Sequence, residues 1–450
     1  MTRLLLPPFS RRRLLGAAGA ASLISPSAFA QSTLGGNVAS GPAISVSGAQ
    51  NAPIPVAITS FGSSPVATQI TQVITDDLSH SGLFRAIDPA SFVPNSMNNG
   101  VPVWQNWSLI GSQAVITGDV QDNGGGQLRV EFRLWDVQKQ AQVQGTAFTT
   151  NADNWRRIAH IIADTVYQQM IGEKGYFDSR VAFISIAGQV TSPIRRLAVM
   201  DYDGANVQFL TNGANMALTP QYNPTRQQLA FVSYRGGENP RVYLFDLQSG
   251  ATQLVGSFGE MTIGPRFSPD GNSLLMSVTR NGGAAIVRTS LDGSGVVQLT
   301  DSNSINVTPC YSPDGSQIVF NSDRDGNQQL FVMNADGSNQ RRISFGPGEY
   351  AEPAWSPRGD SIAYTFFGSG GFSIGVMAPD GSGERILTQG YLVEGSTYCP
   401  NGRVIMFYRQ TPTAVGHTSN LATIGVDGFN ERLVNTPTYA SDPSWGPLLT

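Results

Sequence analysis

The stretch Pro265-Arg266-Phe267-Ser268-Pro269-Asp270-Gly271 decides the fold, because the chain repeats it at an almost constant spacing. Close copies read Pro-Cys-Tyr-Ser-Pro-Asp-Gly from Pro309 and Pro-Ala-Trp-Ser-Pro-Arg-Gly from Pro353. A repeat of about 44 residues that contains several short strands is typical of a β-propeller. Weaker copies begin at Pro220, Ser396 and Pro443, so that successive copies lie 45, 44, 44, 43 and 47 residues apart.

Each repeat predicts one four-stranded blade. The aromatic-Ser-Pro piece is the inner strand, and Ser-Pro-Asp-Gly is the turn that follows, where Pro fixes φ and Gly accepts a positive φ. A second turn of the type Asp-Gly leads from the third strand of the blade into the outer strand. It recurs at residues 203–204, 292–293, 336–337, 380–381 and 427–428.

The ends of the repeat predict how the ring closes. Sets of three strands begin at six places, but no inner strand precedes the first set. The C-terminal strand at 443–447 must therefore complete the first blade, which leaves no exposed sheet edge. We expect an all-β, six-bladed propeller over residues 176–450. The six sets begin near Arg180, Gln228, Ser273, Gln317, Ser361 and Arg403.

Residues 53–175 read as a separate α/β domain. An apolar strand at 54–59 is followed by Ser64 and Pro65, which are typical of the first residues of a helix. Apolar residues then recur at helical spacing until Leu78, and Gly82 ends the helix. Further strands are expected at 84–87, 114–120, 128–135 and 141–149, and a closing helix is expected at 154–171.

The residues before this domain read as an export signal and an arm. Three arginines at 11–13 precede a short apolar run, and Ala28-Phe29-Ala30 matches a small-x-small cleavage site. We expect residues 1–30 to be a signal peptide that is removed after Ala30, with secretory and twin-arginine export both open. Residues 31–52 consist largely of Gly, Ser, Ala and Asn, and they predict a flexible arm.

The composition excludes several classes of protein. Of 450 residues, 50 are Gly and 27 are Pro, but no Gly-x-y period of the collagen type connects them. The formal net charge is −4, and removal of the signal takes away four arginines and makes it −8. An acidic mature chain without a basic cluster argues against nucleic-acid binding. After residue 30, no apolar run approaches the roughly 20 residues that a membrane-spanning helix needs.

The residues that carry chemistry do not form a catalytic set in the sequence. The one G-x-S-x-G string, at residues 371–375, falls inside the propeller repeat and not at the strand-to-helix turn of a nucleophile elbow. His80, His160 and His417 are too few and too scattered for a multi-histidine metal site. Cys310 and Cys399 fall in inner-strand slots two blades apart, so free thiols are expected. We therefore predict no enzyme, no catalytic residue, no metal and no cofactor. A propeller hydrolase or lyase, or a glycan-binding propeller, remains the alternative.

The loops that connect the outer strand of one blade to the inner strand of the next are rich in contact residues. Aromatic residues and methionines stand there beside carboxylates and amides, a combination that suits a protein partner. We expect these loops to form the partner-binding mouth of the propeller. The candidate residues are Met216, Glu260, Met261, Asn303, Asn306, Glu349, Tyr350, Glu352, Tyr391, Glu394 and Tyr439.

The order of these parts resembles the TolB family of the Tol–Pal system over nearly the whole mature chain. In the α/β domain, residues 77–84 read Asp-Leu-Ser-His-Ser-Gly-Leu-Phe and are similar to the family's D-L-x-x-S-G-x-F. Residues 157–164, Arg-Ile-Ala-His-Ile-Ile-Ala-Asp, and residues 172–177, Gly-Glu-Lys-Gly-Tyr-Phe, also look like family pieces.

The resemblance implies a periplasmic scaffold that works as a monomer. Such proteins bind the outer-membrane lipoprotein Pal at the propeller mouth and the inner-membrane protein TolA through the N-terminal arm. They maintain outer-membrane integrity and support constriction during cell division. In this chain the arm contacts would fall on Ile44, Ser45, Val46 and Ser47, as in strand addition to a partner's sheet. The arm departs from the family pattern because it is longer and lacks acidic residues.

Overall fold

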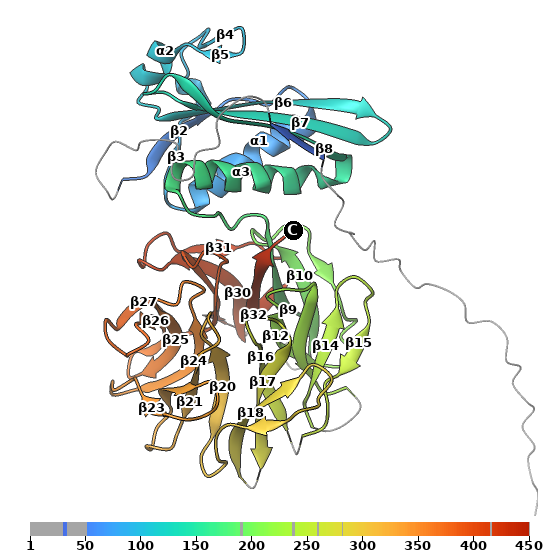
Figure 1. The fold of residues 1–450 in the computed structure, drawn as a ribbon, viewed down its shortest axis with the longest axis vertical. Coiled ribbons are helices and arrows are strands. Elements are labelled where there is room, and N and C mark those ends of the chain that lie inside the picture. The colour runs from blue at the N-terminus through green and yellow to red at the C-terminus, as the bar shows by residue number, and fades with distance from the viewer. Residues whose placement is uncertain are drawn as a thin grey trace, which may run out of the picture.

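A propeller carries a smaller α/β domain on one of its ends (Figure 1). The computed structural model describes residues 30–33, 52–189, 192–235, 239–258, 261–280, 282–414 and 416–449. In this part of the chain the strands form six four-stranded blades, a six-stranded sheet and a short hairpin. The expected propeller and the expected α/β domain are both confirmed. The expected signal segment, and the arm apart from β1 (Ala30–Thr33), lie outside the described residues.

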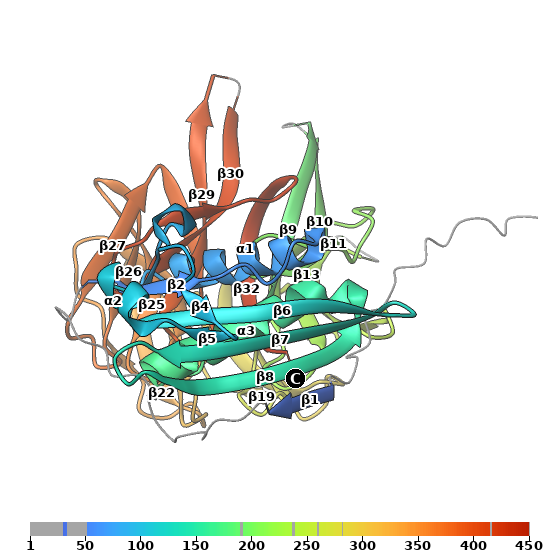
Figure 2. The same ribbon diagram turned by 90° about the horizontal axis from the view of Figure 1, so that it is seen from above.

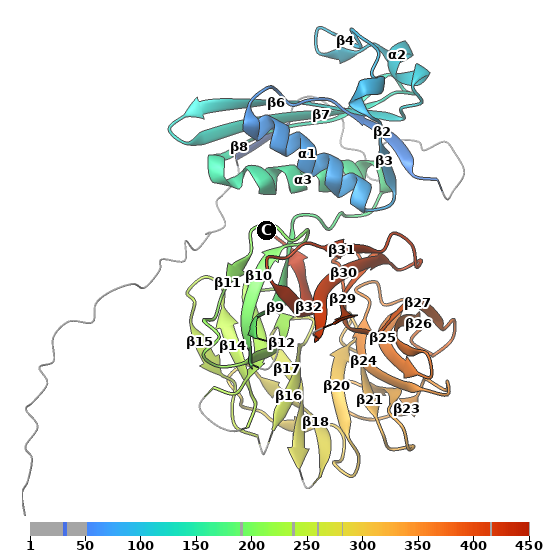
Figure 3. The same ribbon diagram turned by 180° about the vertical axis from the view of Figure 1, so that it is seen from behind.

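The α/β domain is one mixed sheet with two helices on the face that is turned to the propeller (Figure 3). The strand order is β1-β8-β7-β6-β2-β3. Strand β2 runs parallel to β3 and β6, and the remaining pairs are antiparallel. Figure 2 shows β1 at the edge beside β8. The elements are β2 (Ile54–Ile58), α1 (Pro65–His80), β3 (Phe84–Ala86), β6 (Ala114–Gly124), β7 (Gln127–Asp136), β8 (Ala141–Asn151) and α3 (Trp155–Ile171).

Local sequence explains the first helix. The hydroxyl of Ser64 accepts a hydrogen bond from the N–H of Ala67 at 3.2 Å, and Pro65 occupies the first turn, where its missing N–H has no cost. Ile70, Ile74 and Leu78 are buried along one side. Helix α1 thus confirms the prediction from periodicity.

One layer of the domain was not predicted. Helix α2 (Trp104–Leu109) and the hairpin of β4 (Met97–Asn98) and β5 (Val101–Pro102) cover the sheet face that is turned away from the propeller (Figure 1). Trp107 is fully buried there, and its indole N–H donates to the carbonyl of Ser96 at 3.0 Å. A few aromatic contacts, rather than periodicity, hold this layer in place.

Five blades follow one another along the chain, each with its inner strand first. They are β12 (Ala217–Tyr222), β13 (Gln228–Ser233), β14 (Arg241–Asp246) and β15 (Thr252–Leu254); β16 (Thr262–Phe267), β17 (Ser273–Arg280), β18 (Gly283–Ser290) and β19 (Val297–Gln298); β20 (Asn306–Tyr311), β21 (Gln317–Ser322), β22 (Gln329–Asn334) and β23 (Arg341–Arg342); β24 (Glu349–Trp355), β25 (Ile362–Gly368), β26 (Gly371–Met377) and β27 (Arg385–Gly390); β28 (Leu392–Tyr398), β29 (Val404–Thr413), β30 (Gly416–Gly425) and β31 (Arg432–Val434).

The remaining blade joins the two ends of the propeller. It consists of β9 (Ser179–Gln189), β10 (Ser192–Asp201), β11 (Gln208–Phe209) and, as the inner strand, β32 (Tyr439–Leu448). Strand β32 pairs antiparallel with β9, and its Trp445 donates an indole hydrogen bond to the Ser179 hydroxyl at 2.8 Å. The predicted closure by the C-terminal strand is confirmed.

The Ser-Pro-Asp-Gly turn is held by its serine. The Ser312 hydroxyl donates to Asp314 at 2.6 Å and accepts from the N–H of Gln317 at 2.9 Å, while Gly315 takes a φ of 72°. In the repeat that begins at Ser396, Cys399 replaces the serine, and its sulfur accepts from the N–H of Val404 at 3.2 Å. Cys310 and Cys399 are both free thiols, as expected.

The blades present different turns at their two ends. The Ser-Pro-Asp-Gly and Asp-Gly turns face the α/β domain, because Arg358 of the first kind reaches Glu173 and Asn430, beside the second kind, reaches His80. The connections from outer to inner strands open at the opposite end, which we call the distal mouth (Figures 1 and 3). Within the described residues, no helix is both long enough and apolar enough to cross a membrane.

Candidate functional site

The distal mouth exposes several of the residues predicted to bind a partner. Met216, Tyr391 and Tyr439 are exposed, Tyr391 to 63%, although each is a large apolar or aromatic side chain. Asn303 and Glu349 are exposed on neighbouring connections, and Met261 is half-buried. A cluster of exposed aromatic and methionine side chains at one end of a propeller is typical of a protein-binding surface.

Two of the predicted surface residues are buried instead. Asn306 is fully buried, and its amide donates to the carbonyls of Ala284 and Asp301 at 3.0 and 3.1 Å. Tyr350 is 1% exposed, and its hydroxyl donates to Glu384 at 2.7 Å. The prediction that they offer contact surface is wrong, because both use their polar atoms to hold the connections that carry the exposed residues.

Other predicted residues lie outside the part of the chain that the structure describes. These are Glu260 at the mouth and, in the arm, Ile44, Ser45, Val46 and Ser47.

The sequence reasoning missed further apolar residues of the mouth. Phe345 is 73% exposed, between β23 and β24, and its ring lies under the Arg342 guanidinium at 5.2 Å. Ile305, before β20, and Phe367, at the end of β25, are also exposed. Phe345 and Ile305 lie in connections that were already predicted to form the mouth. An apolar side chain in such a loop could have identified both as contact residues.

A ring of left-handed residues lines the central channel. Each inner strand carries a β-bulge, and the bulged residue has a positive φ, 42° at Thr219, 50° at Glu352 and 51° at Asp442. Non-glycine residues rarely take this conformation, and such strain concentrates at functional sites. The full ring is Thr219, Gly264, Thr308, Glu352, Gly395 and Asp442, and all six border one cavity of about 60 Å³.

The ring places carboxylates in the channel. Glu352 accepts hydrogen bonds from the N–H of Gly395 at 2.9 Å and from the Thr365 hydroxyl at 3.4 Å. Burial, followed by repulsion from Glu394, raises the pKa of Glu352 to about 7. Burial also raises the pKa of Asp442 and of Glu394 above their usual range. Burial in the channel therefore disfavours the charged form of these carboxyl groups.

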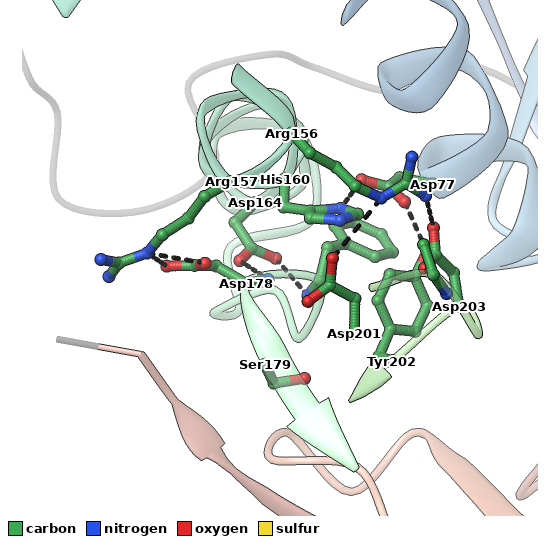
Figure 4. Close-up of polar contacts among 12 residues, drawn as sticks. Asp77, Arg156, Arg157, His160, Asp164, Asp178, Ser179, Asp201, Tyr202 and Asp203 are labelled. Atoms are coloured by element: carbon green, nitrogen blue, oxygen red, sulfur yellow. Dashed lines mark hydrogen bonds and ion pairs between the residues drawn. The ribbon is translucent and has the colours of Figure 1, made fainter. Parts of the chain in front are cut away.

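A second polar cluster joins the two domains (Figure 4). Asp77 of α1 is its centre. It accepts a hydrogen bond from the hydroxyl of Tyr202 in the propeller at 2.6 Å, and its other oxygen lies 2.7 Å from Nδ1 of His160 in α3. Arg156 forms ion pairs with Asp201, at 3.5 Å, and with Asp203. These contacts tie both helices to the first blade.

The charge of His160 follows from this setting. Burial alone would lower the pKa of His160, but the charge and the hydrogen bond of Asp77 outweigh burial and raise it to about 9. His160, Asp201 and Asp203 could in principle hold a metal ion, since their ligand atoms lie within 4.8 Å of one another. The Arg156 guanidinium already lies between the two carboxylates, so the cluster carries its own cation (Figure 4).

A third contact lies at the chain connection between the domains. Arg403 pairs with Glu173 through two hydrogen bonds, at 2.6 and 2.9 Å, and Arg358 adds a third at 3.2 Å. Arg358 stands where the strong repeats have Asp. This copy is among the close ones, and no role was predicted for its Arg, although the departure from the repeat was visible.

The connection itself is held by Asp164. Its carboxylate accepts from the N–H groups of Phe177 and Asp178, both at 2.9 Å, and a Cβ on Gly175 would lie only 1.9 Å from it. A side chain at Gly175 would therefore displace the carboxylate that fixes the first residues of the propeller.

Comparisons with known proteins agree for both parts of the chain. The family model of the TolB amino-terminal domain matches residues 42–143, and that of the TolB beta propeller domain matches residues 167–449. The Tol-Pal system protein TolB of Gluconobacter oxydans (strain 621H) is 50% identical over 448 residues, which cover 98% of this chain and 96% of the relative. The crystal structure of TolB from Acinetobacter baumannii is 25% identical, with a TM-score of 0.78, and the match covers 93% of this chain and 100% of that one.

Proposed function

The chain belongs to the TolB family of Tol–Pal system proteins, and from this premise we propose that it is a periplasmic scaffold without enzymatic activity. It binds a Pal-type outer-membrane lipoprotein at the distal mouth and a TolA-type inner-membrane protein through the arm at residues 31–52. By linking the two membranes it maintains the envelope and supports constriction during division. Export by a signal that is cleaved after Ala30 brings it to the periplasm.

The exposed side chains of the distal mouth carry the proposal. Tyr391, Tyr439, Met216 and Phe345 offer rigid apolar area that a soluble monomer ordinarily buries, and Glu349 and Asn303 stand beside them. Aromatic anchors surrounded by polar side chains are the usual composition of a binding hot spot. The histidines suit the enzymatic alternative poorly, since His80 and His160 lie at the domain junction and His417 lies in β30.

The test is a direct binding measurement. The mature chain and the periplasmic domain of the Pal-type lipoprotein from the same organism are titrated by calorimetry. Replacement of Tyr391 and Tyr439 by Ala should weaken binding by about 2 kcal/mol or more, the loss typical of a hot spot. The matched control is Phe429→Ala, because Phe429 is as exposed but lies in the Asp-Gly turn at the opposite end.

Two results would refute this assignment: no binding by the unaltered chain, or an equal loss in the control. For the arm, deletion of residues 31–51 should abolish binding of the TolA-type protein and leave Pal-type binding in place. If deletion leaves TolA-type binding intact, the arm assignment and the contacts at Ile44 and Val46 fall.

A further inference from the structure

We propose that the channel at the distal mouth receives one cationic side chain, an arginine or a lysine of the protein that docks there, and that Glu352, Asp442 and Glu394 bind it. This inference rests on the proposed function, since it states how the same mouth holds its partner. It adds a charged contact at the centre of a surface that also exposes large apolar residues.

The backbone aims these carboxylates into the channel. Glu352 and Asp442 both sit at the bulged position of an inner strand, with left-handed φ values of 50° and 51°. A regular strand would point successive side chains to the two faces of the blade instead. The bulge thus moves two acids from blade faces to the lining of one shared cavity.

Arg266 attracts Glu352 and Arg195 attracts Asp442, but in the part of the chain that the structure describes neither arginine forms an ion pair with these acids. Among the described residues, no arginine, lysine or histidine forms an ion pair with Glu352, Glu394 or Asp442. Arg266 is the cation that borders the cavity, and it hydrogen-bonds the side-chain oxygen of Gln221. Half-buried carboxylates that have neutral hydrogen-bond donors but no ion-pair partner favour binding of a positive group from outside.

A buried hydroxyl in the same cavity points to a ligand independently of charge. Ser396 is 3% exposed, borders the cavity, and its Oγ has no hydrogen-bond partner among the described residues. The Thr219 hydroxyl also has no hydrogen-bond partner among the described residues, and Thr219 also borders the cavity. Buried polar atoms are ordinarily paired, so these two oxygens are acceptors available to the N–H groups of an entering ammonium or guanidinium.

The size of the cavity limits what can enter. A volume of about 60 Å³ is small beside the roughly 300–1,000 Å³ of a usual ligand pocket. That is room for the charged end of one side chain, and the rest of the partner must stay outside on the apolar residues of the mouth.

The affinity should depend on pH in a defined direction. Because the pKa of Glu352 is raised to about 7, this group is partly protonated near neutral pH, and a bound cation favours its charged form. Affinity should therefore rise as pH increases from 5.5 to 8. The charged and titratable groups that face Glu352 are Glu394, Asp442, Arg266 and Tyr408, and of these the two carboxylates, whose pKa values burial also raises, respond in the same direction.

The experiment uses the full mature chain and the periplasmic domain of the Pal-type lipoprotein, in buffer with a chelator of divalent cations. Glu352→Gln and Asp442→Asn should each raise Kd about 10-fold, as expected for loss of one charged hydrogen bond. Asp119→Asn is the matched control, since it removes one exposed carboxylate from β6 of the α/β domain. It should change Kd less than twofold.

The partner side of the contact is then located. Each lysine and arginine of the lipoprotein domain is replaced by Gln and measured with both forms of residue 352. One replacement should lose its effect when Glu352→Gln is already present, which shows direct coupling. The thermal midpoint of each variant is measured alone, and Glu394→Gln replaces any variant that does not fold.

Two outcomes overturn the inference without touching the proposed function. In the first, the lipoprotein binds but neither Glu352→Gln nor Asp442→Asn weakens it more than the control. In the second, binding needs added divalent cations and no basic residue of the partner couples to Glu352, so that the occupant is a metal ion. Absence of any lipoprotein binding instead refutes the proposed function.

Discussion

At the scale of single residues, Asp77 decides how the two domains are held. It lies on α1, is 1% exposed, and serves both Tyr202 of the propeller and His160 of α3. A buried carboxylate with two such partners is costly to remove, because each partner is left with an unpaired polar group.

The first prediction concerns this carboxylate. Asp77→Asn should lower the free energy of unfolding by about 3–5 kcal/mol, since it leaves the charged His160 without its counter-ion. Urea unfolding followed by tryptophan fluorescence measures the change. The neighbouring Asp76→Asn is the control, because Asp76 is only half-buried and accepts a hydrogen bond from Gln72 alone. Equal losses in both variants would contradict the role given to Asp77.

The second prediction concerns pH. The pKa of His160 is raised from 6.5 to about 9, so the native state keeps a proton that the unfolded chain releases. The stability from this proton is complete below pH 6.5 and is lost as pH rises through 9. Unfolding measured between pH 7.5 and 9.5 should show this decline, and His160→Gln should flatten it. His417→Gln, in the β29–β30 hairpin, should leave the slope unchanged.

The sequence could not predict that these residues form a cluster. Asp77 and His160 were both quoted as parts of family-like motifs, yet 83 residues separate them, and Tyr202 is 125 residues from Asp77. Local patterns place a residue on an element, but the contact depends on how two helices dock on a blade. Their charges alone would equally suit a solvent-exposed position.

At the scale of elements, the sequence repeat was sufficient to predict the inner strand of each blade and the turn that follows it. The Ser-Pro-Asp-Gly residues specify the backbone themselves, through a fixed φ at Pro, a positive φ at Gly and a serine that bonds its own turn. Helix α1 was equally readable from its cap and periodicity. Helix α2 and strands β4 and β5 were not, because they are short and packing of Trp107 holds them in place.

The third prediction tests the turn. Ser312→Ala should lower the free energy of unfolding by about 1–2 kcal/mol, because the N–H of Gln317 loses its acceptor in a buried place. Ser316→Ala is the control in the same turn, since its exposed hydroxyl also bonds Asp314 but closes no strand. Chemical unfolding of both variants checks this. The turn account fails if the control is destabilised as strongly.

For the loops of the mouth, the sequence predicts where each loop lies but not which way its side chains point. Their position at one end of the ring followed from strand order, and Tyr391, Tyr439 and Met216 are exposed there. Asn306 and Tyr350 belong to two other connections at the same end of the ring, and both are buried. Residue type alone could not separate the two groups, because the direction of a loop side chain depends on neighbouring blades.

At the scale of the whole molecule, one hydrophobic core crosses the boundary between the domains. It includes Ile70 of α1, Ile162 of α3 and Trp445 of the closing strand. Trp445 stacks on Tyr202 and meets Tyr176 edge-on, with ring centres 6.1 and 5.7 Å apart. The domains are therefore expected to unfold together.

The fourth prediction follows from this shared core. Calorimetry of the mature chain should give a single unfolding transition, and Trp445→Ala should lower its midpoint and split it in two. Trp355→Ala is the matched control, since Trp355 fills the same slot of another blade but packs in a core confined to the propeller. It should lower the midpoint without splitting. Two transitions in the unaltered protein would show that the domains are thermodynamically independent.

The closing strand β32 also sets an order of events in time. Its partner β9 lies about 250 residues earlier, as in the pair Tyr439 and Ile186, so the ring cannot close until the last strand has left the ribosome. Contacts of such long sequence separation form slowly. Until then β9 presents an open edge, which invites pairing with other chains. Newly synthesised molecules thus pass through a vulnerable interval that ends only when residues 439–448 pair with β9.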